Sequence, residues 1–103
     1  MNWNLNKDYK EVCTAILQDS LASLRAKAGL SQDDISSIIG MTRQTYHALE
    51  TGKQQIPWTT FLAFIFFFRE LDVTKEMIAD LRIFPIELFL SLNRQIPRRN
   101  IDG

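Results

Sequence analysis

Cysteine and histidine are almost absent from this sequence, which has one residue of each among 103. A lone Cys13 excludes an intrachain disulfide, and no residue spacing typical of a zinc or redox site is present. Because Cys13 keeps helical spacing with Leu17 and Leu21, we expect it to be buried as a small hydrophobic residue. The sequence therefore predicts no metal site and no cofactor.

An excess of charge of either sign is also missing. Twelve Lys and Arg residues balance twelve Asp and Glu residues. From residue 20 to residue 56 the basic residues outnumber the acidic ones by one, and Arg94, Arg98 and Arg99 lie close together near the end. Proteins that bind nucleic acid usually carry a clearer basic patch. Charge by itself therefore does not suggest a nucleic-acid partner.

No hydrophobic run is long enough to cross a bilayer. The most apolar run, residues 61–68, is far shorter than the roughly 20 residues of a transmembrane helix. The first residues do not show the basic region and apolar stretch of a signal peptide. We therefore expect a cytoplasmic protein with no membrane contact.

Strand patterns, internal repeats and low-complexity segments are absent, whereas apolar residues recur at helical spacing along most of the chain. This length suits one domain with a small core, and we expect an all-α domain of five or six helices. The expected helices run from near Asp8 to Gly29, from Ser31 to Gly40, from Thr42 to Gly52, over about 58–70, over about 75–84 after a Thr74 cap, and onward from Pro85.

The expected helix at 58–70 is unusually aromatic. One face carries four apolar side chains, at Phe61, Phe64, Ile65 and Phe68. Phe66 and Phe67 lie largely off that face, which predicts a helix buried on most sides. Residues 93–103 are polar, contain Pro97, and are expected to form a loose tail.

The most informative segment is residues 30–53, which predicts two short helices joined by a tight turn. Ser31 can cap the first helix, and Asp34 three residues later completes a capping-box pattern. Gly40 follows the last apolar position, where a helix often ends in a left-handed residue. Thr42 can then cap the second helix.

The apolar residues of this segment predict which helix faces point inward. On the first helix, Ile35, Ile38 and Ile39 form one apolar face, and Met41 can fill the gap between the helices. The second helix has a narrow apolar side. Its inward residues are Tyr46 and Leu49, and its outward residues are Arg43, Gln44, Thr45, His47 and Ala48.

This segment contains Leu-Ser-Gln, then Gly, then Thr-Arg-Gln-Thr, then Leu-Glu-x-Gly-Lys. At these spacings it resembles the helix-turn-helix of the Cro/phage-repressor (Xre-like) family of DNA-binding domains. Matching positions continue to Leu24-Arg25 and Gly29 upstream and to Ile56-Pro57 downstream. The resemblance implies a lambda-repressor-like core with an extra C-terminal helix. It divides the chain into an extension with the start of the first helix (1–19), a helix-turn-helix DNA-binding domain (20–71), and C-terminal helices with a tail that belong to the same domain (72–103).

A helix that reads the major groove needs hydrogen-bonding forks and small apolar groups near its N-terminal end. Gln44 can pair with adenine N6 and N7, and Arg43 can pair with guanine or neutralise a phosphate. Ala48 can meet a thymine methyl group, and His47 can contact a base or the backbone. These four residues are the expected base contacts.

The remaining expected contacts are with phosphate. The resemblance implies that Gln32, Thr42 and the backbone around Lys53 to Ile56 meet phosphates, and we add Thr45 and the side chain of Lys53. A helix N-terminus suits Thr42 to this role, because its free N–H groups favour anions. Lys53 can equally be a solvated surface charge.

Two charged residues have a structural interpretation. Arg25 and Glu50 stand at positions where the family usually forms a buried ion pair between the first helix and the end of the recognition helix. Tyr46 stands where the family usually has a branched aliphatic residue. We therefore expect the ion pair to support the fold rather than to touch DNA.

The preferred function is a sequence-specific, DNA-binding transcriptional regulator that reads operator DNA with the helix at 42–50, acting as a homodimer on double-stranded DNA. The apolar excess from Phe66 to Leu92 is the expected dimer surface, although it can equally be internal core. The alternative is a protein-interaction module, such as an antitoxin-like protein that binds a partner through its C-terminal helices. An enzyme is disfavoured, because no paired carboxylates or Gly-rich phosphate loop are evident.

Overall fold

A computed structural model describes residues 6–95 of the chain. Over that range it contains six helices and no strand: α1 (Lys7–Ala28), α2 (Gln32–Ile39), α3 (Arg43–Glu50), α4 (Trp58–Glu70), α5 (Lys75–Leu81) and α6 (Ile86–Gln95). The predicted all-α class is confirmed. None of these helices is long and apolar enough to cross a membrane. Most of the expected tail, with Arg98 and Arg99, lies outside the described residues.

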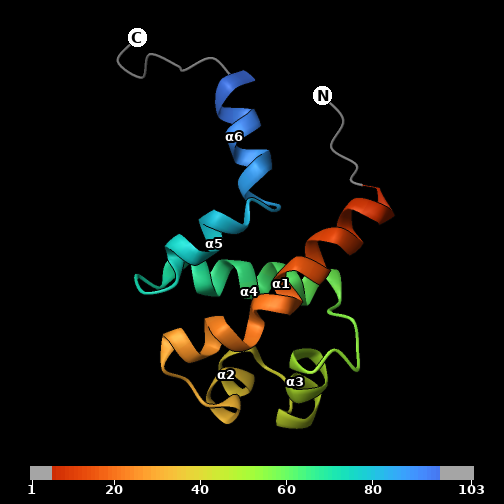
Figure 1. Ribbon diagram of the computed structural model, residues 1–103, viewed down its shortest axis with the longest axis vertical. Coiled ribbons are helices and arrows are strands. Elements are labelled where there is room, and N and C mark those ends of the chain that lie inside the picture. The colour runs from red at the N-terminus through yellow and green to blue at the C-terminus, as the bar shows by residue number, and fades with distance from the viewer. Residues whose placement is uncertain (1–5, 96–103) are drawn as a thin grey trace.

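The six helices are arranged as a central pair, with a further pair toward each end of the molecule. Helices α1 and α4 cross in the middle, α2 and α3 lie together at one end, and α5 and α6 lie toward the other (Figure 1). α1, α3, α4 and α5 enclose the core, because α1 contacts each of the other three and α4 contacts α5. α2 contacts α3, so the pair is presented at the end of the molecule.

Helix α1 begins earlier than the sequence predicted. The side chain of Asn6 accepts a hydrogen bond from the backbone N–H of Tyr9 at 2.7 Å and caps the helix, whereas Asp8 lies in its first turn. Asn and Asp are about equally good caps, so the two positions compete. The predicted end is confirmed, since Gly29 adopts a left-handed conformation with φ 73°.

The core is a cluster of aliphatic residues around four buried aromatic rings, those of Tyr46, Phe61, Phe64 and Phe68, with Trp58 packed against it. Tyr46 of α3 meets Phe64 of α4 edge-on with 6.0 Å between ring centroids, and Trp58 stacks on Phe61 at 4.7 Å. The fully or almost fully buried residues of α1 in this core are Cys13, Leu17, Leu21 and Leu24, so the predicted burial of Cys13 is confirmed. Helix α3 is therefore anchored on this core through its buried residues Tyr46 and Leu49.

Helix α4 has the bounds that the sequence predicted and the predicted core face. All four residues of that face are buried: Phe61, Phe64, Ile65 and Phe68. The prediction that the helix is buried on most sides is confirmed in part: Phe67 is half-buried against the core, whereas Phe66 is 69% exposed.

The region after α4 differs from the sequence prediction in two ways. Thr74 precedes α5, but its hydroxyl donates to the carbonyl of Phe68 at 2.6 Å instead of capping the helix. α5 ends at Leu81, not at residue 84, because Arg82 adopts a left-handed conformation with φ 51°.

Helix α6 follows Pro85 as predicted, and it extends to Gln95. The expectation that residues 93–95 belong to a loose tail is therefore wrong. α6 buries none of its ten residues and projects away from the body of the molecule (Figure 1).

Candidate nucleic-acid interface

The first motif helix, α2, begins at the predicted capping box. The Ser31 hydroxyl accepts from the backbone N–H of Asp34 at 3.0 Å, and the Asp34 carboxylate accepts from the backbone N–H of Ser31 at 3.0 Å. Hydrogen bonds from Ser31 to this carboxylate hold the pKa of Asp34 below its ordinary value. The helix ends at Gly40, which takes a left-handed conformation with φ 94°.

The turn between α2 and α3 is also held by hydrogen bonds between residues that are close in the sequence. The backbone N–H groups of Gly40 and Met41 both donate to the carbonyl of Ser36 at 2.9 Å. Met41 is half-buried against the core, and Thr42 caps α3 by accepting from the backbone N–H of Thr45 at 3.1 Å. The predicted turn and caps are therefore confirmed.

The inward face of α2 is only in part the one predicted. Ile35 is buried and Ile39 is half-buried, but Ile38 is 54% exposed. Ser36 takes the inward position instead, with its hydroxyl donating to the carbonyl of Asp33 at 3.0 Å. A small residue at this position lets α2 lie close to its neighbours, and Ile38 points outward.

Helix α3 separates an anchoring side from an outward side, as predicted. Tyr46 and Leu49 are buried. The outward residues are Arg43, Gln44, Thr45 and His47, which are exposed, and Ala48, which is half-buried. A shallow hollow of about 330 Å³ is lined by Gln32 of α2 and by Arg43, Gln44 and His47 of α3.

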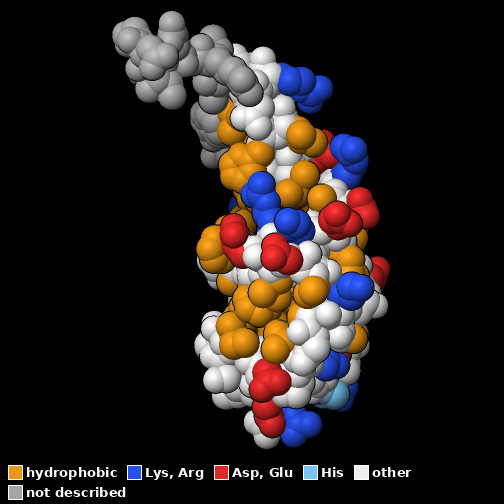
Figure 2. All heavy atoms as spheres, turned by 90° about the vertical axis from the view of Figure 1, so that its left-hand side faces the viewer, with side chains coloured by type: hydrophobic (Ala, Val, Ile, Leu, Met, Phe, Trp, Pro, Cys, Tyr) orange, Lys and Arg blue, Asp and Glu red, His pale blue; other side chains and the backbone are white. Residues whose placement is uncertain are grey.

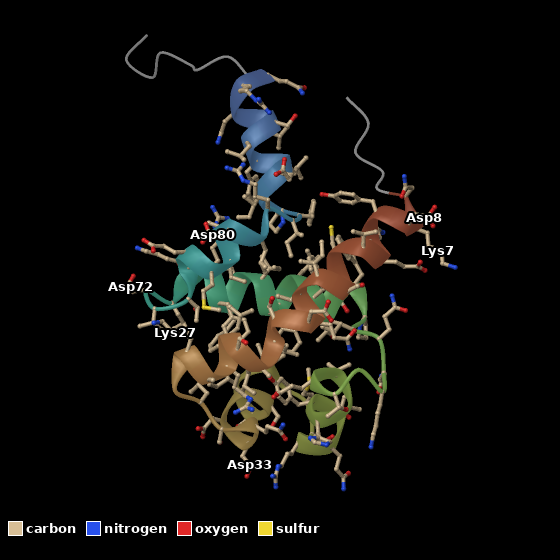
Figure 3. All side chains as sticks on the ribbon, viewed as in Figure 1. Lys7, Asp8, Lys27, Asp33, Asp72 and Asp80 are labelled. Atoms are coloured by element: carbon tan, nitrogen blue, oxygen red, sulfur yellow. The ribbon has the colours of Figure 1, made fainter. Side chains whose placement is uncertain are left out.

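This hollow lies at the end of the molecule that is formed by α2 and α3. Figure 3 places Asp33 at that end, among projecting nitrogen-bearing side chains. Asp33 Oδ1 is 3.7 Å from Arg43 Nε, and both side chains are mostly exposed. Exposed ion pairs of this kind contribute little to stability, so Arg43 is free to find another partner.

Behind the outward side, Arg25 of α1 pairs with Glu50 at the end of α3. Arg25 Nε donates to Glu50 Oε2 at 2.9 Å, and Nη2 donates to Oε1 at 2.8 Å. The remaining Arg25 Nη1 donates to the carbonyl of Leu30 at 3.0 Å. These bonds from Arg25 lower the pKa of the Glu50 carboxyl, although burial opposes the shift. The structure thus brings together the two residues assigned to a structural ion pair.

The Tyr46 hydroxyl is the one buried polar side-chain atom of the described residues without a partner in hydrogen-bond geometry. It lies beside the Glu50 carboxylate. Burial first, and then this carboxylate, raise the pKa of Tyr46 well above its ordinary value. The Tyr46 ring thus lies in the core, and its hydroxyl is left poorly satisfied.

Two polar contacts at this end were missed by the sequence analysis. Gln18 of α1 donates from Nε2 to the carbonyls of Leu49 at 2.6 Å and Gln54 at 2.7 Å. Gln32 Oε1 lies 3.2 Å from His47 Nδ1. Partners that are 15 to 36 residues apart leave no local pattern, so neither contact carries a sequence signal.

The other expected contact residues lie around the same end. Thr42 Oγ1 donates to Thr45 Oγ1 at 2.9 Å, which leaves the Thr45 hydroxyl hydrogen free to point outward. Lys53 is exposed in the loop between α3 and α4. No cluster of three or more metal-binding side chains occurs within residues 6–95.

Comparison with known proteins agrees with this geometry. A family model described as a helix-turn-helix domain matches residues 18–74, which is more than half of the chain. Searches of curated proteins and of solved structures gave no match. The matched segment begins at Gln18, contains the whole α2–turn–α3 unit, and ends at Thr74 after α4. The chain therefore belongs to the helix-turn-helix domain family.

Proposed function

We propose that this protein is a sequence-specific transcriptional regulator of the Cro/phage-repressor (Xre-like) type, which places α3 in the major groove of operator DNA. The observation that carries the proposal is the division of α3: Tyr46 and Leu49 are buried, while Arg43, Gln44 and His47 are exposed around one hollow. In a helix-turn-helix domain, the N-terminal residues of the second helix reach base edges. The protein acts in the cytoplasm by occupying DNA, not by catalysis.

The base contacts come from the first half of α3. Gln44 pairs with adenine N6 and N7, and Arg43 pairs with guanine O6 and N7. The Asp33 carboxylate near Arg43 is exposed, so DNA can displace it. Ala48 is half-buried and meets a thymine methyl only where the helix lies deep in the groove.

Phosphate contacts come from helix starts and from the following loop. Gln32 is the first residue of α2, and Thr42 caps α3, so both stand where backbone N–H groups attract anions. Thr45 contributes its free hydroxyl hydrogen, and Lys53 contributes a charge. Gln18 supports this loop by bonding the carbonyl of Gln54.

A second copy of the chain completes the site. One recognition helix reads only a few base pairs, so useful specificity normally requires two half-sites and a dimer. Phe89 and Leu90 of α6 are each 42% exposed, and Phe66 of α4 is 69% exposed. Figure 2 shows hydrophobic side chains gathered in patches on one side of the molecule, including its upper part. We propose that α6 provides the dimer contact.

The dimer is tested by size-exclusion chromatography with light scattering on the full chain. The expected mass is that of two copies, and a Phe89→Glu/Leu90→Glu variant is expected to give one copy with an unchanged helical spectrum. A monomeric wild-type chain would overturn the homodimer. A monomer would favour the alternative, an antitoxin-like module that binds another protein through α6. The balanced net charge of the chain also favours this alternative.

DNA binding is tested by selecting duplexes from a random library with the full chain at low salt. We expect an enriched motif with two related half-sites. A matched Arg43→Ala/Gln44→Ala variant is expected to give no such motif. Failure of the wild-type chain to enrich any sequence would overturn the proposed function.

A further inference from the structure

His47 is the single histidine of the chain, and it faces outward from α3. Its Nδ1 atom lies 3.2 Å from Oε1 of Gln32, the first residue of α2. Which ring nitrogen of a neutral histidine carries the proton is set by the hydrogen bond that the ring makes. The orientation of the Gln32 amide therefore decides what His47 can offer to DNA.

The Gln32 carbonyl determines which ring nitrogen of His47 carries the proton. The carbonyl end of the Gln32 amide faces His47, because Oε1 is the amide atom that lies 3.2 Å from Nδ1 of the ring. The carbonyl oxygen of Gln32 can only accept, so Nδ1 of His47 must be the donor. A neutral imidazole has one N–H, which leaves Nε2 as an acceptor.

We propose that Gln32 is a positioning residue that fixes His47 in the Nδ1–H form, so that Nε2 accepts a hydrogen bond from an exocyclic amino group of adenine or cytosine in the major groove. Adenine N6 and cytosine N4 are the donors that this groove presents. This inference rests on the proposed function. It adds a hydrogen-bond acceptor to a helix whose other proposed base-contacting side chains, Arg43 and Gln44, include donors.

The tautomer is tested without DNA. Because the chain has one histidine, the ¹⁵N spectrum of its ring in the full chain is unambiguous. In spectra of the neutral ring, recorded at about pH 9, we expect a protonated Nδ1 and an unprotonated Nε2. A Gln32→Met variant keeps the side-chain length but removes the amide, and it should shift the ring toward the Nε2–H form. Gln55→Met, an exposed loop change, is the control.

A wild-type ring in the Nε2–H form would overturn the inference, as would an unchanged ring in Gln32→Met. Neither result affects the proposed DNA binding. Circular-dichroism melts of both variants show whether the fold is retained.

Base reading is tested on the duplex that wild type selects. His47→Ala should relax discrimination at one position, and Gln32→Met should relax the same position while also weakening binding to all duplexes. Replacing the adenine there by purine, or the cytosine by its analogue without the 4-amino group, should weaken wild-type binding about tenfold and leave His47→Ala binding unchanged. Unchanged discrimination in His47→Ala would overturn the inference alone, whereas no selected duplex at all would overturn the proposed function.

Discussion

Arg25 and Glu50 join α1 to the end of α3 through two parallel hydrogen bonds, of 2.9 Å and 2.8 Å. Such a two-pronged pair fixes orientation as well as distance. The Glu50 side chain is 8% exposed and that of Arg25 is 22% exposed, so solvent screens the pair only in part. The angle at which α3 leaves the core therefore depends on this pair.

Removing either partner should destabilise the fold. In Arg25→Ala or Glu50→Ala the remaining charge loses its partner in a largely buried position, and we expect a loss of about 3 kcal/mol in unfolding free energy. Urea unfolding of both variants measures this loss, with Gln44→Ala as an exposed control that should not change. An Arg25→Met/Glu50→Leu double variant should recover most of the stability, because apolar residues of similar size replace such pairs well. Equal stability of Gln44→Ala and Glu50→Ala would contradict the structural role.

Stability should also fall in acid through Glu50. The folded state lowers the pKa of this carboxyl, so the unfolded chain takes up its proton first as the pH falls. The contribution is complete above the ordinary glutamate pKa of about 4.3, and it is lost as the pH falls through that value toward the lower folded pKa. Unfolding by urea at about pH 7, 5 and 3.5 should show a smaller decline for Glu50→Gln than for wild type. Asp34, whose pKa is also lowered, accounts for part of the remaining decline.

The Tyr46 hydroxyl should be dispensable for folding, whereas its ring should not. Tyr46→Phe removes a buried hydroxyl without a well-formed hydrogen bond, so we expect the unfolding free energy to stay within about 1 kcal/mol of wild type or to rise. Tyr46→Ala removes the ring that meets Phe64 and should cost about 3–5 kcal/mol. Thermal melts of the two variants make the comparison. A large loss in Tyr46→Phe would show that the hydroxyl has a partner after all.

The sequence predicted the elements whose signals are local. The capping box of Ser31 and Asp34, the left-handed Gly40 and the bounds of α4 each depend on residues within a few positions of one another. Such signals are readable because the hydrogen bond or backbone conformation involved is fixed by neighbours in the chain. The candidate site was outlined for the same reason, since helical spacing alone separates Tyr46 and Leu49 from the outward residues.

The sequence could not decide between competing residues or show distant contacts. Ile38 and Ile39 are adjacent and equally apolar, so their order of burial depends on how closely α2 approaches its neighbours. Thr74 had a plausible local role as a cap, but a carbonyl six residues earlier accepts its hydroxyl. The contacts of Gln18 and of Gln32 join different helices, and only the folded arrangement reveals them.

Gln18 should hold the loop that carries Lys53. Gln18→Leu leaves the carbonyls of Leu49 and Gln54 without their donor, and we expect a loss of about 1–2 kcal/mol in unfolding free energy. The loop should also open more often, so the backbone N–H of Gln54, which bonds the carbonyl of Ala48 at 3.2 Å, should exchange with solvent faster than in wild type. Asp19→Asn, at the next and exposed position, is the matched control for hydrogen exchange. Unaltered exchange at Gln54 in Gln18→Leu would contradict this role.

Gln44 and Lys53 should affect DNA binding in different ways, because one is proposed to read a base and the other a phosphate. Gln44→Ala should cost about 1–3 kcal/mol on the selected duplex and relax discrimination at one position. Lys53→Ala should weaken binding to all duplexes alike and reduce the slope of log affinity against log salt by about one.

Residues 20–56 carry only a small excess of basic residues, which limits the affinity for DNA of any sequence. Non-specific binding depends on the number of neutralised phosphates, so it should be weak, and it should fall further as salt is added. Most of the useful affinity must then come from base contacts and from the second half-site. Titrations at several salt concentrations, on the selected duplex and on a scrambled one, separate the two contributions. Equal affinity of wild type for both duplexes would remove Gln44 from its role, because a base contact must distinguish them, whereas a Lys53→Ala chain that lost only the selected duplex would make Lys53 a base contact instead.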